Sequence, residues 1–283
     1  MIRFLLLLLA LMPFQNCLQA RALDDFLFRK SAPTAPPMIR VLVVNERPGV
    51  VVEVKGKYRL YDPKDLKHIS TRFLGKRKYI QALKGGLQWG EEFPGLYQVM
   101  IVPDEQNITV VVDGVEYRGS IYIYDIEGKI SVVNEVFIED YLASLLAPQV
   151  RSIYPEEMLA AIAITARTNA YYQVENPKNA YWDVDGKAIK YQGHSVTDGR
   201  SPIEQAIDAS RYLIMSRSPA DTQKAVPIQA QWDFLRPTGG EVVDASISLT
   251  EGEAMAKKGD HAAKILEKAF PGTSILLMHY TSG

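Results

Sequence analysis

Apolar side chains in residues 137–173 recur every three or four positions, which is the spacing of one face of an α-helix. The first stripe predicts a helix that begins near Ile138 and ends before Pro148, because proline removes a backbone hydrogen bond from a helix interior. The second predicts a helix that begins at Pro155, where proline suits the first turn. The apolar positions of the two stripes are Ile138, Leu142, Leu145 and Leu146, then Met158, Leu159, Ile162, Ala166 and Ala170.

The preceding hundred or so residues have a different pattern, of short β-branched runs separated by turn residues. The dipeptide Asp113-Gly114 is typical of a tight hairpin turn between two such runs. The runs predict strands at residues 39–45, 50–54, 58–61, 97–102, 109–112, 115–117, 120–125 and 130–134.

The chain after Gln173 is rich in loop-forming residues. Apolar spacing predicts a helix over Pro202–Met215, and a run of apolar residues predicts a strand over Val226–Trp232. A helical segment interrupted at Gly259 is predicted over Glu251–Ala269, because glycine is unfavourable inside a helix.

The first residues have the pattern of an export signal: Arg3, an apolar run at residues 4–12 that is too short to span a bilayer, and Ala-Arg-Ala at residues 20–22. Cleavage there would remove Cys17, the single cysteine of the chain. The residues before Cys17 are not small, so a lipoprotein is not expected. We expect an exported, periplasmic or envelope-associated protein that meets the membrane only through its signal peptide. The alternative is a disordered or membrane-anchoring tail.

These patterns together give the domain organisation. We expect a signal peptide at residues 1–22, a proline-rich linker at 23–37 and one domain at 38–280. The predicted fold class is α+β, with a β-rich platform of hairpins at about residues 38–135. A helical and loop-rich lobe that carries the paired central helices is expected at about residues 136–280.

Composition excludes some classes of partner. The 283 residues are 47% apolar and 23% charged, as in a typical globular domain. The net charge of −1 predicts no strong electrostatic attraction to nucleic acid or to an anionic membrane, and no binding of nucleic acid is expected. One basic cluster lies in a segment whose pattern predicts no clear element. It is either solvated surface or a contact with an anionic cell-wall polymer, and its members are Arg72, Lys76, Arg77, Lys78 and Lys84.

Three motifs resemble those of one known family. The first reads IEDYL at residues 138–142, the second AITARTNA at 163–170 and the third GEAMAKKG at 252–259. In this order they resemble the stage II sporulation protein D family, which includes the amidase enhancer of cell-wall hydrolases. The resemblance extends over residues 38–278.

The resemblance implies a peptidoglycan substrate and lytic transglycosylase action on glycan strands stripped of peptides. In that reaction a carboxylic acid protonates the oxygen between two sugars, and a 6-hydroxyl closes on C1 to leave a 1,6-anhydro end. Where the family has glutamate, this sequence has Gln149, which cannot donate an acidic proton. We expect either a binder with little or no cutting activity, or an acid supplied by Glu156 or Glu157 of the second helix or by Glu139 or Asp140 of the first. The alternative role of all four is charge at a helix start, with a scaffold role in the family for Glu139 and Asp140.

Five further residues are expected to bind substrate: Arg167, Thr168, Tyr191, Gly193 and Tyr141. An arginine in an alanine-rich, apolar helix needs a partner, so the alternative to glycan contact is an internal salt bridge between Arg167 and Glu139. Many relatives carry a Cys/His loop that can hold zinc, but this chain has only His194 there, so we expect no metal and no cofactor.

The expected partners follow from the same resemblance. They are peptidoglycan glycan strands and, from the amidase-enhancer branch, a cell-wall amidase that the chain would recruit or activate. The implied role lies in cell division or envelope remodelling. A structural envelope protein without affinity for glycan is the remaining alternative.

Overall fold

The computed structural model describes residues 36–150, 154–194, 200–217, 225–236 and 241–280. Its residues group into two compact units, of which one spans Pro37–Met278 and the other combines residues 1–36 with 279–283. The expected signal peptide and almost all of the expected linker lie outside the described residues. The helices and strands named below all belong to the unit Pro37–Met278.

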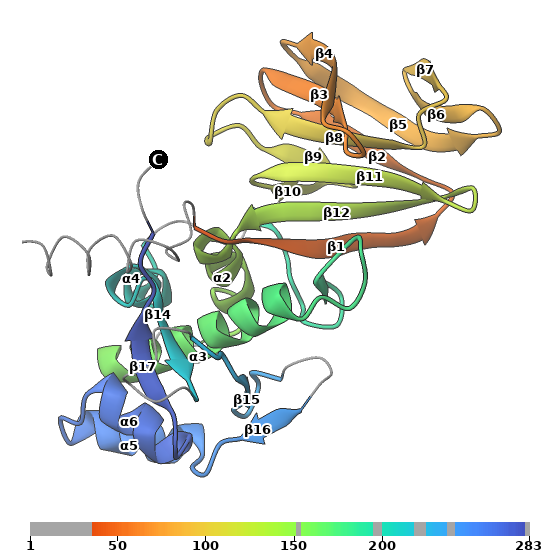
Figure 1. Ribbon diagram of the computed structural model, residues 1–283. Coiled ribbons are helices and arrows are strands. Elements are labelled where there is room, and N and C mark those ends of the chain that lie inside the picture. Colours follow the sequence, from red (N-terminus) through yellow and green to blue (C-terminus); the bar gives the residue numbers. More distant parts are fainter. Residues whose placement is uncertain (1–35, 151–153, 195–199, 218–224, 237–240, 281–283) are drawn as a thin grey trace, which may run out of the picture. The chain divides into compact units, whose positions relative to one another are not determined.

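The larger sheet lies in the first half of this unit, with β13 added from later in the chain (Figure 1). Its neighbours pair antiparallel, except that β13 joins its edge in parallel with β1. The order of its strands is β13 (Val184–Asp185), β1 (Met38–Arg47), β12 (Lys129–Phe137), β11 (Ser120–Ile126), β8 (Gln98–Pro103), β3 (Tyr58–Asp62) and β4 (Lys67–Arg72).

A second sheet shares a core with the first. Val52 of the second sheet and Leu60, Ile101 and Ile121 of the first are all 0% exposed and belong to one apolar cluster. Removing such side chains from water is the main force that holds two sheets together. The order of its strands is β10 (Val115–Tyr117), β9 (Val110–Val112), β2 (Gly49–Val54), β5 (Gly75–Leu83), β6 (Gly86–Trp89) and β7 (Glu91–Pro94).

The eight strands predicted between residues 39 and 134 all have counterparts in the structure. The segment without a clear predicted element contains β4 and β5. The structure thus confirms the predicted α+β fold class, with a β-rich first half. Among the described residues, no helix combines the length and the apolar character needed to cross a bilayer.

Two helices follow β12, as predicted: α2 (Ile138–Leu146) and α3 (Glu156–Glu175). The N-cap of α3 is Pro155, and α3 is buried along most of its length. It contacts β1 on one side and the C-terminal elements on another, so it lies at the centre of the second half of the unit (Figure 1). The many alanines of α3 allow these neighbours to approach closely.

Most of the remaining elements pack around α3, whereas β16 pairs with β15 and β17 with β14. Capping boxes begin two of the helices, at Ser201 and at Ser248, each with a glutamate three residues later. In chain order the elements are α4 (Pro202–Ala209), β14 (Leu213–Ser216), β15 (Gln229–Gln231), β16 (Val242–Asp244), α5 (Leu249–Lys257), α6 (Ala262–Ala269) and β17 (Ser274–Leu277).

The helix predicted over Pro202–Met215 is wrong in its second half. The helix ends at Ala209, and Tyr212 has a left-handed φ of 65°. Residues of β14 then pair antiparallel with β17, from Leu213 opposite Leu277 to Ser216 opposite Ser274. Because β17 lies near the end of the chain, the local apolar spacing could not reveal this pairing.

Candidate functional site

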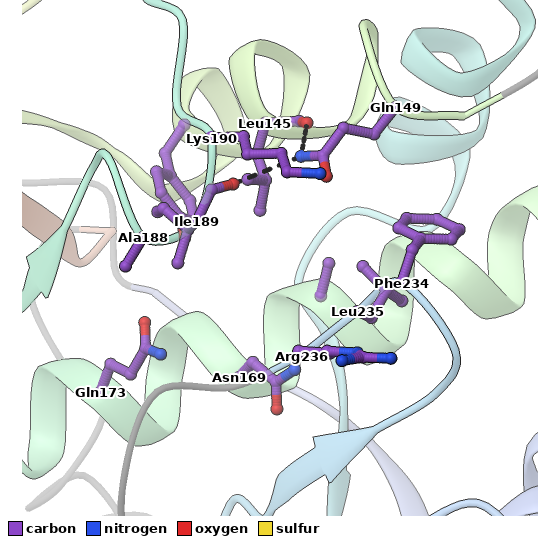
Figure 2. A pocket seen from close by; sticks show the side chains of 12 residues that line it. Leu145, Gln149, Asn169, Gln173, Ala188, Ile189, Lys190, Phe234, Leu235 and Arg236 are labelled. Atoms are coloured by element: carbon purple, nitrogen blue, oxygen red, sulfur yellow. Dashed lines mark hydrogen bonds between the residues drawn. The ribbon is translucent and has the colours of Figure 1, made fainter.

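A pocket of about 430 Å³ lies where the end of α2, the middle of α3 and two loops meet (Figure 2). One loop follows β13 and the other follows β15. Its lining residues are Tyr141, Leu145, Gln149, Ala166, Asn169, Gln173, Ala188, Ile189, Lys190, Phe234, Leu235 and Arg236. The volume falls within the range of ordinary small-molecule sites.

Gln149 occupies one wall of this pocket. The chain continues past α2 in a tight turn, in which the Gln149 amide donates to the Leu146 carbonyl at 3.0 Å. The side-chain Nε2 donates to the Leu145 carbonyl at 2.7 Å and to the Ile189 carbonyl at 3.4 Å (Figure 2). The glutamine thereby links the end of α2 to the loop after β13.

The described lining residues include no carboxyl group. They do include two cations, Lys190 and Arg236, which form no ion pair with any described residue. Amide groups and apolar side chains make up most of the rest. Such a lining can hydrogen-bond a neutral polar ligand and attract an anionic one, but it contains no acid that could protonate a leaving group.

Gln173 is a lining residue that the sequence did not single out. Its Oε1 is buried and has no hydrogen-bond partner among the described residues, although the residue is only 6% exposed. Buried acceptors normally have a partner, so this unsatisfied oxygen in a lining residue is a candidate contact for a ligand. Asn169 lies one turn earlier on α3, and both project from the wall opposite Gln149 (Figure 2). The sequence feature that could have identified Gln173 is this pair of amide side chains, four residues apart in an otherwise apolar helix.

The loop after β15 supplies Phe234 and Arg236. Asp233 anchors this turn, because its carboxylate accepts a 2.8 Å hydrogen bond from the Leu249 amide at the start of α5. The turn is closed by a bridge between Trp232 and Leu235. No local pattern identifies Phe234 or Arg236 as lining residues, since the rest of the pocket lies far away in the sequence.

Arg167 was expected to contact substrate, and the structure instead places it in the interior. It is 0% exposed, and its Nε and Nη2 donate to the two carboxylate oxygens of Glu139 at 2.9 and 2.8 Å. Its remaining donors reach the Ile207 and Leu213 carbonyls and the Ser210 hydroxyl. This is the internal salt bridge that the sequence allowed as the alternative, and it also engages Glu139.

Thr168 is also an internal residue. It is 0% exposed, its Oγ1 donates to the Ile164 carbonyl at 2.7 Å, and the same oxygen accepts from the Met215 amide at 2.9 Å. The hydroxyl therefore fastens β14 to α3. Neither Arg167 nor Thr168 offers a surface to a ligand in this structure, because protein atoms surround both.

Three tyrosines form a stack beside the pocket. Tyr191 lies between Tyr117 and Tyr141, with ring centroids 6.1 and 5.7 Å away. Its hydroxyl donates to Asn134 Oδ1 at 2.8 Å. Burial raises the pKa of Tyr141 and of Tyr191, so both phenols stay neutral at physiological pH. Only Tyr141 lines the pocket, and Tyr191 holds the loop that carries Ile189 and Lys190.

Gly193 ends that loop in a conformation that needs glycine. Its φ is 74°, and a Cβ there would lie 2.4 Å from the Glu116 carbonyl oxygen of β10. Gly193 is buried and does not line the pocket. The structure thus gives this predicted substrate-binding residue a steric reason for its identity.

The carboxylates that could replace the family acid lie elsewhere. Glu156 is exposed and does not line the pocket. Glu157 accepts hydrogen bonds from the Ala262 amide at 2.7 Å and from His261 at 3.1 Å, and these interactions, the amide first, lower its pKa. Asp140 pairs with Arg118 at 3.3 Å. In the part of the chain that the structure describes, no three His, Cys, Asp or Glu residues are grouped as metal ligands would be.

Comparisons with known proteins identify a family and several relatives. The family model "Stage II sporulation protein" matches residues 126–216, which contain α2, α3 and the loop with Lys190. An uncharacterized protein of Chlamydia pneumoniae is 31% identical over 254 residues, which cover 89% of this chain and 85% of that protein. An uncharacterized protein of Chlamydia muridarum is 29% identical over 86% of this chain and 78% of its own length. One from Brachyspira hyodysenteriae is 31% identical over 62% of this chain and 48% of its own length. The chain therefore belongs to the stage II sporulation protein (SpoIID) family.

Proposed function

We propose that this chain is an exported peptidoglycan-binding factor that holds a glycan strand in the pocket beside Gln149 to remodel the cell wall. The observation that carries the proposal is the position of Gln149. It lines the pocket, while no described lining residue has a carboxyl group, and the resemblance to the family implies a glutamate at this position. The strand would be bound without the proton donor that lytic transglycosylase action requires.

The lining suits a sugar polymer. The amides of Gln149, Asn169 and Gln173 present donors and acceptors that match hydroxyl and acetamido groups. Phe234 and Tyr141 add aromatic surface for the apolar face of a sugar ring. Apolar surface with a few fixed polar groups is the usual composition of a ligand site.

The surroundings of Gln149 also indicate how a glutamate would behave there. The Leu145 and Ile189 carbonyls, which now accept from Nε2, would accept a hydrogen bond from a carboxylic acid and repel a carboxylate. Both effects raise the pKa of a carboxyl group, which favours a general acid at neutral pH. The wall around residue 149 is therefore built for a protonated group, and the glutamine keeps the shape without the acidity.

The same observation supports a second proposal, which is that the chain recruits or activates a separate cell-wall amidase. A family member without a general acid can still bind glycan and present it to another hydrolase. The nearby carboxylates of Glu139 and Asp140 have ion-pair partners in the protein, which favours binding over cutting.

The deciding experiment restores the acid with Gln149→Glu. Purified glycan stripped of peptides is incubated with the wild type, Gln149→Glu and Gln149→Ala, and anhydro-ended sugars are counted by mass spectrometry. We expect the revertant to exceed the wild type by about 10²–10⁴-fold, the usual contribution of general acid catalysis. All three should sediment with intact sacculi.

A matched control is Glu156→Gln, which removes a carboxylate outside the pocket. Cutting by the wild type that survives Gln149→Ala but is lost in Glu156→Gln would show that Glu156 is the acid. Failure of the wild type to sediment with sacculi would reject both proposals in favour of a structural protein.

A further inference from the structure

The connection between β4 and β5 exposes two adjacent apolar side chains. Phe73 is 77% exposed and Leu74 is 68% exposed, the two highest values among the large apolar residues that the structure describes. Single exposed apolar residues are common on proteins, but neighbours that both project into solvent mark contact sites more often.

The backbone at this corner holds both side chains outward. Arg72 pairs with Tyr58 in the larger sheet, and Gly75 pairs with Val54 in the second sheet, so only two residues bridge the sheets. The space behind is filled, since Val54 is 0% and Tyr58 2% exposed. A Cβ on Gly75 would already lie 2.8 Å from the Val54 Cβ. Phe73 and Leu74 therefore have no room to turn into the core.

Exposed cations adjoin the two apolar side chains along the chain. Lys76, Arg77 and Lys78 follow directly on β5, are exposed, and form no ion pair with any residue that the structure describes. The Lys57 ammonium lies over the Phe73 ring, 5.7 Å from its centroid. We name Phe73, Leu74 and these three β5 cations the apolar corner. Lys84, from the same basic cluster of the sequence, lies beyond the far end of β5.

We propose that the apolar corner docks on the surface of an anionic lipid bilayer. Phe73 and Leu74 would enter the boundary between headgroups and acyl chains, and the three cations would face the anionic headgroups. An anionic cell-wall polymer would satisfy the cations, but it is hydrated throughout and offers no apolar phase for the two side chains. The corner shares no residue with the pocket, so this inference is independent of the proposed function.

The inference departs from the expectation from the sequence, which limited membrane contact to the signal peptide. The proximity of residue 73 to lipid can be measured directly. Phe73→Trp in the full chain is mixed with vesicles of phosphatidylglycerol and phosphatidylcholine, or of phosphatidylcholine alone, whose acyl chains are brominated. Bromine quenches tryptophan only at close range. Insertion of the apolar run at residues 4–12 into the vesicle would therefore not by itself quench a tryptophan at residue 73.

The matched control is Leu66→Trp, at the opposite end of β4. Leu66 is 65% exposed in the turn between β3 and β4, close to the 68% of Leu74. The charges nearest to it in the sequence balance, since Lys64 and Lys67 are matched by Asp62 and Asp65. We expect anionic vesicles to quench Phe73→Trp well beyond the wild-type background and to leave Leu66→Trp near that background. Equal quenching at both positions, or none at residue 73, would overturn the proposal.

The electrostatic part has its own variants in the Phe73→Trp background. Replacing Lys76, Arg77 and Lys78 together by glutamine should raise the lipid concentration for half-quenching on the order of a hundredfold. Replacing Lys84, Lys258 and Lys268 together by glutamine removes the same amount of charge elsewhere. This control should change the lipid concentration for half-quenching by less than about threefold. An unchanged value in the first triple variant would contradict the proposal. So would salt-dependent sedimentation with sacculi in the absence of vesicle quenching, which would identify the polymer as the partner.

Discussion

Glu139 and Arg167 form a two-pronged ion pair between the start of α2 and the middle of α3, with N–O distances of 2.9 and 2.8 Å. The pair joins the two helices that line the pocket, and Arg167 extends it to α4 and β14 through backbone carbonyls. Because the arginine side chain is 0% and the carboxylate 14% exposed, the pair is shielded from solvent. The two residues therefore position the walls of the site and do not touch its ligand.

Breaking this pair should destabilise the fold strongly. Arg167→Met leaves the Glu139 carboxylate without its partner, and Glu139→Gln leaves a buried guanidinium short of negative charge. We expect each to lower the free energy of unfolding by about 3–5 kcal/mol in urea titrations. The double variant should lose clearly less free energy of unfolding than the sum of the losses in the two single variants. Strict additivity would mean that the residues do not interact energetically.

Gly193→Ala should displace the loop that carries Lys190. The substituted residue would have both an unfavourable positive φ and a Cβ within 2.4 Å of the Glu116 carbonyl oxygen. The matched control is Gly128→Ala, because Gly128 has a φ of 80° with nothing within 4 Å of its added Cβ. We expect about 1–2 kcal/mol of lost stability at Gly128 and about 2–4 kcal/mol at Gly193. Equal losses at the two glycines would contradict the steric argument.

Glu157→Gln should destabilise the protein in a pH-dependent manner. The Glu157 carboxylate accepts the first amide of α6, whose N-cap residue His261 provides no side-chain cap. The loss at pH 7 should be about 0.5–1 kcal/mol, as for other helix caps. The pKa of Glu157 is lowered in the folded state. Its contribution is thus complete above the unfolded value near pH 4.3 and is lost as the pH falls through the folded value.

Thermal or urea unfolding of both proteins between pH 3 and pH 7 measures this dependence. The difference in the free energy of unfolding between the wild type and Glu157→Gln should shrink as the pH falls. The control is His261→Ala, which leaves the hydrogen bond from the Ala262 amide to Glu157 intact. It should lower the free energy of unfolding at pH 7 by less than Glu157→Gln does. A gap that persists at pH 3 would show that the carboxylate charge is not the source of the stability.

Gln173→Met should weaken glycan binding without weakening the fold. The substitution keeps the length of the side chain and removes an acceptor that has no partner among the described residues. We expect sacculus binding to fall about 5–10-fold, the value of one hydrogen bond, with an unchanged melting temperature. Unchanged binding would mean that the oxygen meets no ligand group.

The helices that form the site could be predicted because their signals are local. Pro148 and Pro155 delimit the connection between α2 and α3. The apolar spacing of α2 matches the side that it buries, whereas α3 is buried on all sides over residues 161–168. The pairing of β14 with β17, in contrast, joins segments far apart in the sequence, and so the helix predicted up to Met215 was too long.

The site itself could be predicted only in part. The resemblance identified Gln149 and Tyr141, which line the pocket, but it also selected Arg167, Thr168 and Gly193, whose identities are explained by burial and backbone geometry. Family motifs retain residues for folding as well as for binding, and a sequence does not separate the two. Phe234 and Arg236 were missed because tertiary contacts alone bring them to the pocket.

Asn169 connects the pocket to a strand that lies behind it. Its side chain donates to the Ala230 carbonyl at 2.8 Å and accepts from the Ala230 amide at 2.7 Å, and the same residue lines the pocket. Anything that occupies the pocket restrains this double clamp and thereby β15. The Ala230 amide proton should therefore exchange with deuterium more slowly when the pocket is filled, which makes a backbone group outside the lining a reporter of occupancy.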